Sequence, residues 1–442
     1  MRHELATMVG AGRRPGFRIG RVASLLLLAS GCGDSTGPPP PPPPPPPDPP
    51  AVITRRIGVR TAGGIGEFYD RTTDRTFVPR GANYVRLAWQ TEPGDTPVFY
   101  HSTFNSGLYE PSRAEAALER MQADGFNVVR VFLNGSCEAG IGQAPLGLSP
   151  AYLDNFADFL RRAAAHQVWV MPTTDAVPGF GEFGDSLNAY CCSPFADYNV
   201  HYLTRGGVNA SALFWHDFVQ GLLARRARVD AIFAYELRNE LYFDSNAPPF
   251  SLASGTVVGA NGHSYDMADP AAKRRLMDEG LVHWADRSRA AIRELVPAAL
   301  VTVGFFVPQE PNPTRIGDPR VIAPYPAIAG STVDFVDLHL YPLAGDRTLS
   351  QLVENFGNAA FAQKPVLMGE FGAYQPTFPT IQQAVQLLRD WQTESCAFGF
   401  KGWLLWTWDS AEQQDFPHWA ATTADSSVER ILAPSTRPDP CR

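Results

Sequence analysis

Eight short apolar segments alternate with amphipathic segments from residue 52 onward, and this alternation constrains the fold more than any other feature of the chain. Such a pattern is typical of parallel strands joined by helices. The predicted strands are Pro79–Leu87, Asn127–Leu133, Val168–Pro172, Ala231–Leu237, Leu300–Phe305, Val333–Leu340, Pro365–Glu370 and Gly402–Thr407. Eight is the number of parallel strands that closes a (β/α)8 TIM barrel. We therefore expect one α/β barrel domain over residues 52–442, with a short N-terminal hairpin over 55–78 that plugs the barrel bottom.

Capping signals mark where the predicted helices begin. Ser112 and Glu115 have the spacing of a capping box. Ser149 and Asp269 each precede a proline, a residue favoured in the first turn of a helix. The expected helices cover residues 112–124, 151–166, 270–295 and 384–394. Residues 309–330 are rich in proline and glycine, so we expect the fifth helix to be short or absent.

Residues 1–31 have the features of a bacterial lipoprotein signal peptide. A region with four arginines precedes the apolar run Val22–Ala29. This run is too short to span a bilayer, which takes about 20 residues. The small residues Ser30 and Gly31 then precede Cys32, which we expect to carry the lipid. An ordinary secretory signal that is cleaved nearby is the alternative.

Residues 32–51 form a predicted tether between the lipid and the barrel. The run Pro38–Pro47 is unbroken proline and continues almost without interruption to Pro50. Proline-rich chains adopt polyproline II at about 3.1 Å per residue, so the tether would reach roughly 40 Å. We expect an exported protein that is lipid-anchored to the membrane or cell surface of a bacterial envelope.

Composition narrows the choice of partners. The formal net charge is −8 and no basic stripe is visible in the barrel segment, so we expect no nucleic-acid partner. No Cys-x-x-Cys or histidine cluster has zinc-ligand spacing, so we expect no metal or cofactor. Without Cys32, five cysteines remain, and one thiol must stay free or pair between chains. The possible disulfides are Cys137 with Cys191 or Cys192, and Cys396 with Cys441. The oligomeric state stays open.

Two of the predicted strands lead to a glutamate. The fourth strand is followed by Asn239 and Glu240, and the seventh ends in Glu370. Catalytic groups of a TIM barrel come from the C-terminal ends of its strands. Retaining glycoside hydrolysis needs two carboxyl groups, one as acid/base and one as nucleophile. Glu240 and Glu370 are therefore the predicted catalytic pair.

Other strands carry residues that suit the same site. Arg130 belongs to the second strand, His339 and Tyr341 end the sixth, and Trp406 lies on the eighth. In this order the residues resemble the retaining β-glycosidases of clan A, most closely glycoside hydrolase family 5. The resemblance covers about residues 52–410. That family has Arg on strand two, Asn-Glu after strand four, His-x-Tyr after strand six, Glu on strand seven and Trp on strand eight.

The resemblance implies how the two glutamates work. Glu370 would attack the anomeric carbon as an ionised nucleophile, with its pKa lowered by Arg130 and its position held by a hydrogen bond from Tyr341. Glu240 would be protonated first and later act as base for water. A weakly polar setting and the charge of Glu370 would both raise the pKa of Glu240.

The resemblance also implies substrate contacts. Asn239 would bind the sugar 2-hydroxyl, His339 would bind the sugar or orient its neighbours, and Trp406 would offer an apolar face to a pyranose ring. Arg130 and Tyr341 would line the same site. One departure is Leu241, because many members of the family have proline there, and this leaves the subfamily open.

Several other polar residues lie close to the predicted site. Glu236 lies inside the fourth strand, so we expect it to be buried and paired. Asn83, Asn134 and Asp175 lie near strand ends and are weaker candidates for sugar contact.

The leading functional hypothesis is hydrolysis of β-mannan or β-1,4-glucan. Endo action is favoured, and exo action remains an alternative. Selectivity would depend on the loops 89–110, 175–208, 241–268 and 307–330. A non-catalytic, surface carbohydrate-binding lipoprotein is the alternative from another class. An esterase is disfavoured, because the sequence has no Gly-x-Ser-x-Gly motif.

Overall fold

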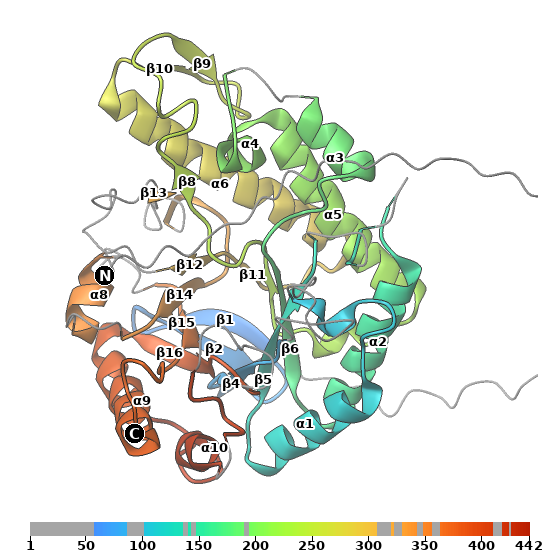
Figure 1. Cartoon of the computed structure of the whole chain (residues 1–442), viewed down its shortest axis with the longest axis vertical. Helices are drawn as coiled ribbons and strands as arrows, with labels where there is room; N and C mark the ends of the chain where they lie inside the picture. The colour runs from blue at the N-terminus through green and yellow to red at the C-terminus, as the bar shows by residue number, and fades with distance from the viewer. Residues whose placement is uncertain are drawn as a thin grey trace, which may run out of the picture. The chain divides into compact units, whose positions relative to one another are not determined.

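The fold is described from a computed structural model of the chain, in which residues 50–442 form one compact unit (Figure 1). The structure describes residues 57–85, 101–135, 140–142, 147–189, 194–306, 320–321, 329–342, 348–355, 363–409, 418–423 and 426–442. The predicted signal peptide, Cys32 and the tether lie outside these residues, as do Cys137, Cys191 and Cys192. None of the described helices is long and apolar enough to cross a membrane.

Eight parallel strands form a closed ring, and Figure 1 shows these strands at the centre of the unit with helices around them. The strands are β4 (Arg80–Asn83), β5 (Val128–Leu133), β6 (Trp169–Thr174), β7 (Tyr235–Glu236), β11 (Val301–Thr302) with β12 (Gly304–Phe306), β14 (Val336–Leu340), β15 (Val366–Phe371) and β16 (Phe400–Leu405). β11 and β12 are two halves of the fifth strand, because β11 pairs with β7 while β12 pairs with β14. The first and last strands, β4 and β16, also pair. The predicted (β/α)8 TIM barrel is confirmed.

The fourth and fifth strands are shorter than predicted. Only Tyr235–Glu236 of the fourth strand is regular, because Val229–Ala231 turns as a short 3-10 helix before it. The fifth strand is interrupted at Val303. A β-carbon at the next residue, Gly304, would lie 2.0 Å from Oε1 of Glu236. Glycine therefore leaves room beside the break for the carboxylate of the neighbouring strand.

Helices surround the ring, and the residues at which they begin can be compared with the predicted N-caps. The main helices are α1 (Pro111–Ala123), α2 (Pro150–Ala165), α5 (Arg205–Ala224), α6 (Pro270–Leu295), α8 (Leu349–Asn355), α9 (Ile381–Ser395) and α10 (Ser427–Leu432). The side chains of Ser149 and Asp269 accept the expected capping hydrogen bonds. The predicted capping box at Ser112 is wrong, because Pro111 already occupies the first position of the helix. A capping box does open α9, at Thr380.

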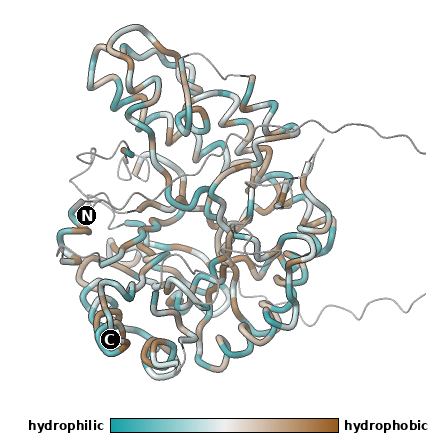
Figure 2. The backbone as a smooth tube through the Cα atoms, in the orientation of Figure 1, coloured by the Kyte–Doolittle hydropathy of each residue, from teal (hydrophilic) through white to brown (hydrophobic). Residues whose placement is uncertain are grey.

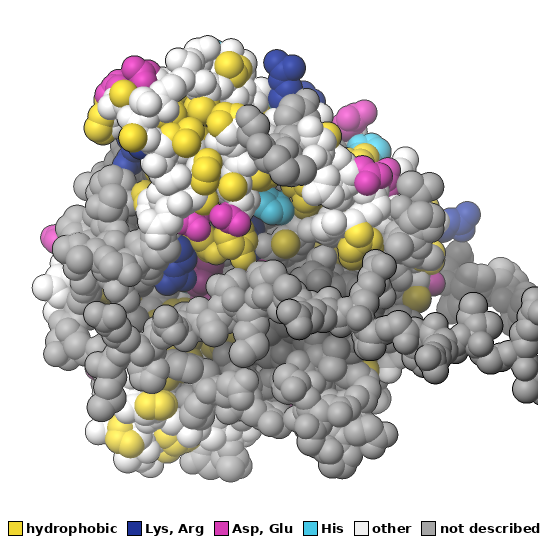
Figure 3. Space-filling model, turned by 45° about the horizontal axis from the view of Figure 1, so that its top comes forward, with side chains coloured by type: hydrophobic (Ala, Val, Ile, Leu, Met, Phe, Trp, Pro, Cys, Tyr) yellow, Lys and Arg dark blue, Asp and Glu magenta, His cyan; other side chains and the backbone are white. Residues whose placement is uncertain are grey.

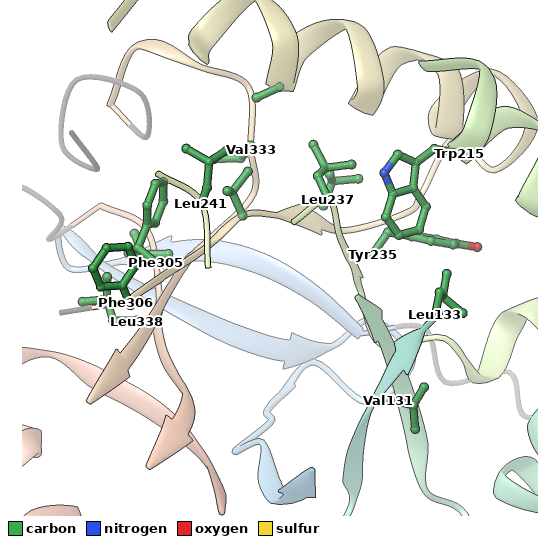
Figure 4. Packing of buried hydrophobic residues seen from close by; sticks show 14 of the residues in the cluster. Val131, Leu133, Trp215, Tyr235, Leu237, Leu241, Phe305, Phe306, Val333 and Leu338 are labelled. Atoms are coloured by element: carbon green, nitrogen blue, oxygen red, sulfur yellow. The ribbon is translucent and has the colours of Figure 1, made fainter. Parts of the chain in front are cut away.

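The outer faces of the strands pack against the helices. Along the tube in Figure 2, hydrophobic and hydrophilic residues alternate within the helices, as expected where one face is buried. Trp215 of α5 packs edge-to-face on Tyr235 at 6.0 Å between ring centroids. Figure 4 shows Leu133 and Leu237 beside this pair, and all four are almost completely buried. The helices thus cover the outside of the ring, and its inside holds an apolar cluster around Phe68 as well as buried polar residues.

The N-terminal end of the barrel is closed by a small antiparallel sheet. Its strands are β1 (Ile57–Ala62), β2 (Ile65–Asp70) and β3 (Arg75–Thr76). Phe68 is fully buried against Phe233 and Phe335, with ring centroids 5.3 and 5.1 Å away. These two rings belong to the start of the fourth and sixth strands. The hairpin predicted to plug the barrel bottom is confirmed, with one strand more than expected.

The C-terminal segment is tied to the barrel in two ways. A disulfide joins Cys396, after α9, to Cys441, and this confirms one of the pairs that the sequence left possible. The buried side chain of Arg80 donates hydrogen bonds to the carbonyl oxygens of Leu432 and Arg437, at 2.6 and 2.7 Å. The chain end therefore packs on the outside of the first strand.

Several short elements extend the loops that follow the strands. They are α3 (Gly181–Asn188), α4 (Tyr198–Leu203), β8 (Phe243–Asp244) paired with β13 (Arg320–Val321), and β9 (Thr256–Val258) paired with β10 (Ser264–Asp266). Most of residues 309–330, where the predicted fifth helix is short or absent, lie outside the described part. On the face in Figure 3, described acidic and basic side chains are scattered among hydrophobic ones.

Candidate active site

Glu240 and Glu370 come together at the C-terminal end of the barrel. Glu240 follows β7, and Glu370 lies near the end of β15. One carboxylate oxygen of each lies within 4.8 Å of the other, and both lie within 4.8 Å of a ring nitrogen of His339. The two differ in exposure, because the Glu240 side chain is 33% exposed and the Glu370 side chain is 5% exposed.

Arg130 is the centre of a buried ion-pair network. Its Nε and Nη2 donate to Oε2 and Oε1 of Glu236, at 2.6 and 3.0 Å. Its Nη1 donates to Oε1 of Glu370 at 2.6 Å and to Oδ1 of Asn83 at 2.8 Å. Its Nη2 also donates to Oδ1 of Asn239, at 2.6 Å. One guanidinium therefore holds the nucleophile candidate and the residue beside the acid/base candidate, and Glu236 is buried and paired as predicted.

Two further hydrogen bonds fix groups at the opening of the site. The Tyr341 hydroxyl donates to Oε2 of Glu370 at 2.6 Å, which is the hydrogen bond expected from the sequence. Nδ2 of Asn239 donates to Oδ1 of Asp175 at 3.0 Å. Because Arg130 holds the oxygen of Asn239 and Asp175 holds its nitrogen, the orientation of this amide is set. One N–H of the amide is left for a ligand.

The pKa of Glu240 is raised to about 7. Burial is the largest cause, and the negative charge of Asp175 is the second. The sequence predicted the rise but assigned the charge effect to Glu370, which is not among its main causes. The interaction between the two glutamates acts on the other partner, because the charge of Glu240 raises the pKa of Glu370. Although burial disfavours the charged form of Asp175, hydrogen bonding and charge from His101 lower its pKa.

The pKa of Glu370 is raised, against the prediction that Arg130 would lower it. Burial is the largest cause and the charge of Glu240 adds to it, and together they outweigh the opposite effects of Arg130 and the Tyr341 hydrogen bond. Arg130 does act in the expected direction. It divides its charge between two glutamates, so its effect on each of them is limited.

His339 is uncharged and lies between the two glutamates. Burial lowers its pKa to about 3. Its Nδ1 lies 3.1 Å from Oε1 of Glu240 and 3.6 Å from Oε1 of Glu370. Its Nε2 points the other way, 3.8 Å from Glu236 and 4.0 Å from Asp337. A neutral imidazole can exchange a hydrogen bond with Glu240 without adding charge to the site.

Three residues predicted to bind substrate are more buried than that role requires. Arg130 and His339 have no exposed surface, and their polar contacts are with carboxylates and amides. Trp406 is 6% exposed and packs edge-to-face on Phe132 at 5.9 Å. We therefore interpret Arg130 and His339 as residues that hold the glutamates. Asn239 and Tyr341 are half-buried and remain accessible to a ligand.

The weaker candidates divide between structure and site. Asn83 is fully buried and its Nδ2 donates to the carbonyl oxygens of Gly369 and Leu405. Asn134 is buried, its backbone N–H donates to the Tyr152 hydroxyl, and its Nδ2 donates to Oδ1 of Asn105. Asn83 contacts the site through Arg130, and Asp175 contacts it through Asn239.

The sequence missed Asp337 and His101. Asp337 is two residues before His339, so the alternation of side chains along a strand places both on the inner face of β14. This two-residue spacing from His339 was the sequence feature that could have identified Asp337. His101 is 2.9 Å from Asp175, and it belongs to a loop, for which no spacing rule exists.

The clustered acids and His339 also have the atom types of metal ligands. Arg130 already supplies the positive charge that two of these acids need, with N–O distances of 2.6 Å to each. The arrangement is therefore that of an ion-pair network. It can stabilise one carboxylate as an anion and keep a second, more exposed one close to its protonation midpoint near neutral pH.

Comparison with known proteins finds likeness at the level of structure. No family model and no curated protein matches the sequence. An endo-1,4-β-mannanase from Rhizomucor miehei has a TM-score of 0.57 at 16% identity, with 86% of this chain and 100% of that chain covered. A glycoside hydrolase family 5 mannosidase from the same organism has a TM-score of 0.53 at 13% identity, with 85% and 96% covered.

A third similar structure is the exo-β-1,4-mannosidase from Opitutaceae bacterium strain TAV5. Its TM-score is 0.52 at 18% identity, and 83% of this chain is covered. The present chain spans 57% of the length of that protein. At these identities the likeness shows the barrel fold.

Proposed function

We propose that the chain is a retaining β-glycosidase with Glu370 as nucleophile and Glu240 as acid/base. The observation that carries the proposal is the short separation of the two carboxyl groups, with one oxygen of each within 4.8 Å of the other. Retaining enzymes hold these groups about 5–5.5 Å apart, whereas inverting enzymes need about 6.5–9.5 Å to admit a water molecule.

The environments of the two glutamates suit the two roles. Glu370 accepts hydrogen bonds from Arg130 and Tyr341, which stabilise the anion that attacks the anomeric carbon. Glu240, with a pKa of about 7, carries a proton near neutral pH and can donate it to the leaving oxygen. The new bond joins a Glu370 oxygen to the anomeric carbon as the bond to the leaving oxygen breaks.

The second step reverses these proton movements. Glu240, now deprotonated, takes a proton from a water molecule that attacks the anomeric carbon and frees Glu370. Esterified Glu370 no longer carries a charge, so Tyr341 and Arg130 lose an anionic acceptor during the intermediate. Asn239 has one free N–H directed by its two fixed contacts, and we propose that it binds the sugar 2-hydroxyl.

The proposed substrate is β-mannan or β-1,4-glucan, as polysaccharide or oligosaccharide. The three similar structures are named mannanase or mannosidase, and this favours mannan. Activity on a panel of mannan, glucan, xylan and aryl β-glycosides tests the choice. A non-catalytic carbohydrate-binding lipoprotein is the second candidate. The network around Glu370 weighs against it, because binding alone does not require an anion held by two donors.

Azide rescue tests the mechanism and assigns the two roles. Glu370→Ala should abolish turnover, because no glycosyl-enzyme can form. Glu240→Ala should still react with an aryl glycoside that has a good leaving group, and the covalent intermediate should accumulate. Azide should then restore turnover and give the β-glycosyl azide, whereas with Glu370→Ala it should give the α-anomer. If the two variants give the opposite azide anomers, Glu240 is the nucleophile and Glu370 the acid/base. If the wild type binds sugar but hydrolyses no glycoside, the protein is a carbohydrate-binding protein.

We also propose that the protein is exported and anchored through lipid on Cys32, with residues 32–51 as tether. The support is the order of charged, apolar and small residues before Cys32 and the proline run after it. Cys32→Ser should release the protein from the membrane fraction or block its processing. An unchanged mass and unchanged fractionation of the variant would contradict lipidation.

A further inference from the structure

Around Gly369, β15 has one residue more than the facing segments of both neighbouring strands. Toward β14, the pairing passes from Met368 to Glu370 and skips Gly369. Toward β16, the segment from Met368 to Phe371 again has one residue more than the segment opposite. This is a β-bulge, a feature that redirects neighbouring side chains. Glu370 therefore leaves the strand directly after a bulge.

The bulge is enclosed from two sides. A β-carbon on Gly369 would lie 2.1 Å from Oδ1 and 2.5 Å from Oδ2 of Asp337, so this carboxyl group fills the space that a side chain would take. On the other side, Nδ2 of Asn83 donates to the carbonyl oxygen of Gly369 at 3.0 Å. Asn83 is in turn held by Arg130. The backbone next to Glu370 is thus fixed by groups from β14 and β4.

Asp337 differs from the other buried acids because it has no strong partner. Its side chain has no exposed surface, and neither oxygen makes a well-aligned hydrogen bond among the described residues. Arg130 is the nearby cation, but its ion pairs are with Glu236 and Glu370. Three buried carboxyl groups therefore surround one guanidinium. A third negative charge here would be uncompensated, and burial of such a charge is very unfavourable.

We propose that Asp337 is a positioning residue for the nucleophile. Its carboxyl group fills the space over the bulge at Gly369 as an uncharged acid, and so fixes the backbone that directs Glu370 without placing another negative charge beside it. This inference rests on the proposed role of Glu370 as nucleophile. It assigns to Asp337 no contact with the substrate.

The electrostatic surroundings agree with an uncharged Asp337. Its pKa is raised well above 3.8 by burial first and then by the charge of Glu236, and the charge of Glu370 adds to this rise. Arg130 and a backbone hydrogen bond from Gly369 act in the opposite direction and are outweighed. The remaining group that faces it is His339, with Nε2 4.0 Å from Oδ1 and uncharged itself. When the network gains one proton, Asp337 takes it, because Glu370 has two strong side-chain donors to its anion, whereas Asp337 has only the backbone N–H of Gly369.

A double-substitution experiment tests the packing of Asp337 on the bulge. Gly369→Ala alone should lower kcat by about 100-fold, because the new methyl group meets the Asp337 carboxyl and displaces Glu370. Asp337→Ala alone should lower kcat by about tenfold. The combined variant should be about as active as Asp337→Ala, because the smaller side chain makes room for the methyl group. If the two effects multiply instead, so that kcat of the combined variant falls by about 1000-fold, the packing argument is overturned.

The charge state has its own test in Asp337→Asn. The acid limb of the kcat/KM profile reports ionisation of the nucleophile in the free enzyme. Since an amide replaces an equally uncharged acid, this limb should stay within about 0.3 pH unit of the wild type. Removal of a real negative charge would instead shift it by about one unit to lower pH, and that shift would overturn the uncharged state. Asp334→Asn, at the start of the same segment and paired with Arg289, is the matched control.

Unfolding measurements separate this inference from the proposed function. The free energies of unfolding of the Gly369→Ala, Asp337→Ala and combined variants should show the same rescue without any substrate. If the wild type hydrolyses no glycoside but the stability rescue is present, the proposed function fails while the packing of Asp337 on the bulge stands. If the wild type is active and both rescues are absent, the positioning role fails.

Discussion

The two sides of the site differ in how their glutamates are held. Glu370 lies inside β15, is 5% exposed, and has hydrogen bonds from Arg130 and Tyr341. Glu240 follows a strand of two residues, is 33% exposed, and its contact at 3.1 Å is with neutral His339. The difference teaches that one side of the site is built to keep a charge in place. The other side allows its carboxyl group to gain and lose a proton.

The elements that carry each glutamate also determine which residues surround its carboxyl group. Arg130 of β5 and Tyr341, the residue directly after β14, donate to Glu370, so its anion is fixed by the strands and their ends. The negative neighbour of Glu240, Asp175, comes from the loop after β6. The proton affinity of Glu240 therefore depends on a loop, and that of Glu370 on the ring of strands. Four predictions test this contrast.

Arg130→Met should have the largest effect. It leaves the Glu236 and Glu370 carboxyl groups buried without their cation, so we expect a loss of about 3–5 kcal/mol in unfolding free energy and more than 1000-fold in kcat/KM. Chemical denaturation and steady-state kinetics measure the two losses. Arg80→Met is the matched control, because Arg80 is equally buried but binds carbonyl oxygens of the chain end. It should lower stability and leave the pH profile unchanged. Equal kinetic losses in both variants would contradict the special role of Arg130.

Tyr341→Phe should act on the nucleophile side alone. Without its hydrogen bond, the pKa of Glu370 rises, because this contact lowers it in the native protein. The acid limb of kcat/KM should move to higher pH, and kcat/KM should fall by about 10–100-fold. Tyr265→Phe removes a matched bond, from Tyr265 to Glu279 at 2.6 Å, and should change neither. A shift of the basic limb in Tyr341→Phe would argue against the division between the two sides.

Asp175→Asn should act on the other side. The negative charge of Asp175 raises the pKa of Glu240, so its removal should lower that pKa from about 7. Activity that needs protonated Glu240 is present below this pKa and lost above it, so the basic limb of kcat/KM should move to lower pH. The fall at the optimum should be about tenfold or less. Asp158→Asn on the surface of α2 is the control, and an unmoved basic limb would contradict the assignment.

Removal of the disulfide should leave both sides of the site unaffected. Cys396→Ser with Cys441→Ser opens a link across a sequence separation of 45 residues. We expect a loss of about 2–4 kcal/mol in unfolding free energy and no change in either limb of the pH profile. Denaturation with and without reductant checks the first part. A shifted pH profile would show that the chain end influences the glutamates.

Sequence reasoning located the glutamates because each follows an apolar strand, and strand ends meet at one end of a barrel. Tyr341 was placed correctly for the same reason. The electrostatics were harder to predict. The pKa of Glu370 depends on how Arg130 divides its charge with Glu236, and the pKa of Glu240 on a loop residue. Neither quantity can be obtained from spacing, because both depend on distances between residues that lie far apart in the chain.

The absence of a side chain has a consequence at two positions beside the site. Gly304 makes room for Glu236, and Gly369 makes room for Asp337, so two acids occupy volume that apolar side chains fill in an ordinary barrel interior. Engineering for heat resistance usually fills such spaces. At Gly304 and Gly369 a larger side chain would displace the neighbouring acid. Substitutions that raise thermal stability must therefore be sought in the helices and loops. The two acids beside the proposed catalytic pair therefore limit how far this end of the barrel can be stabilised.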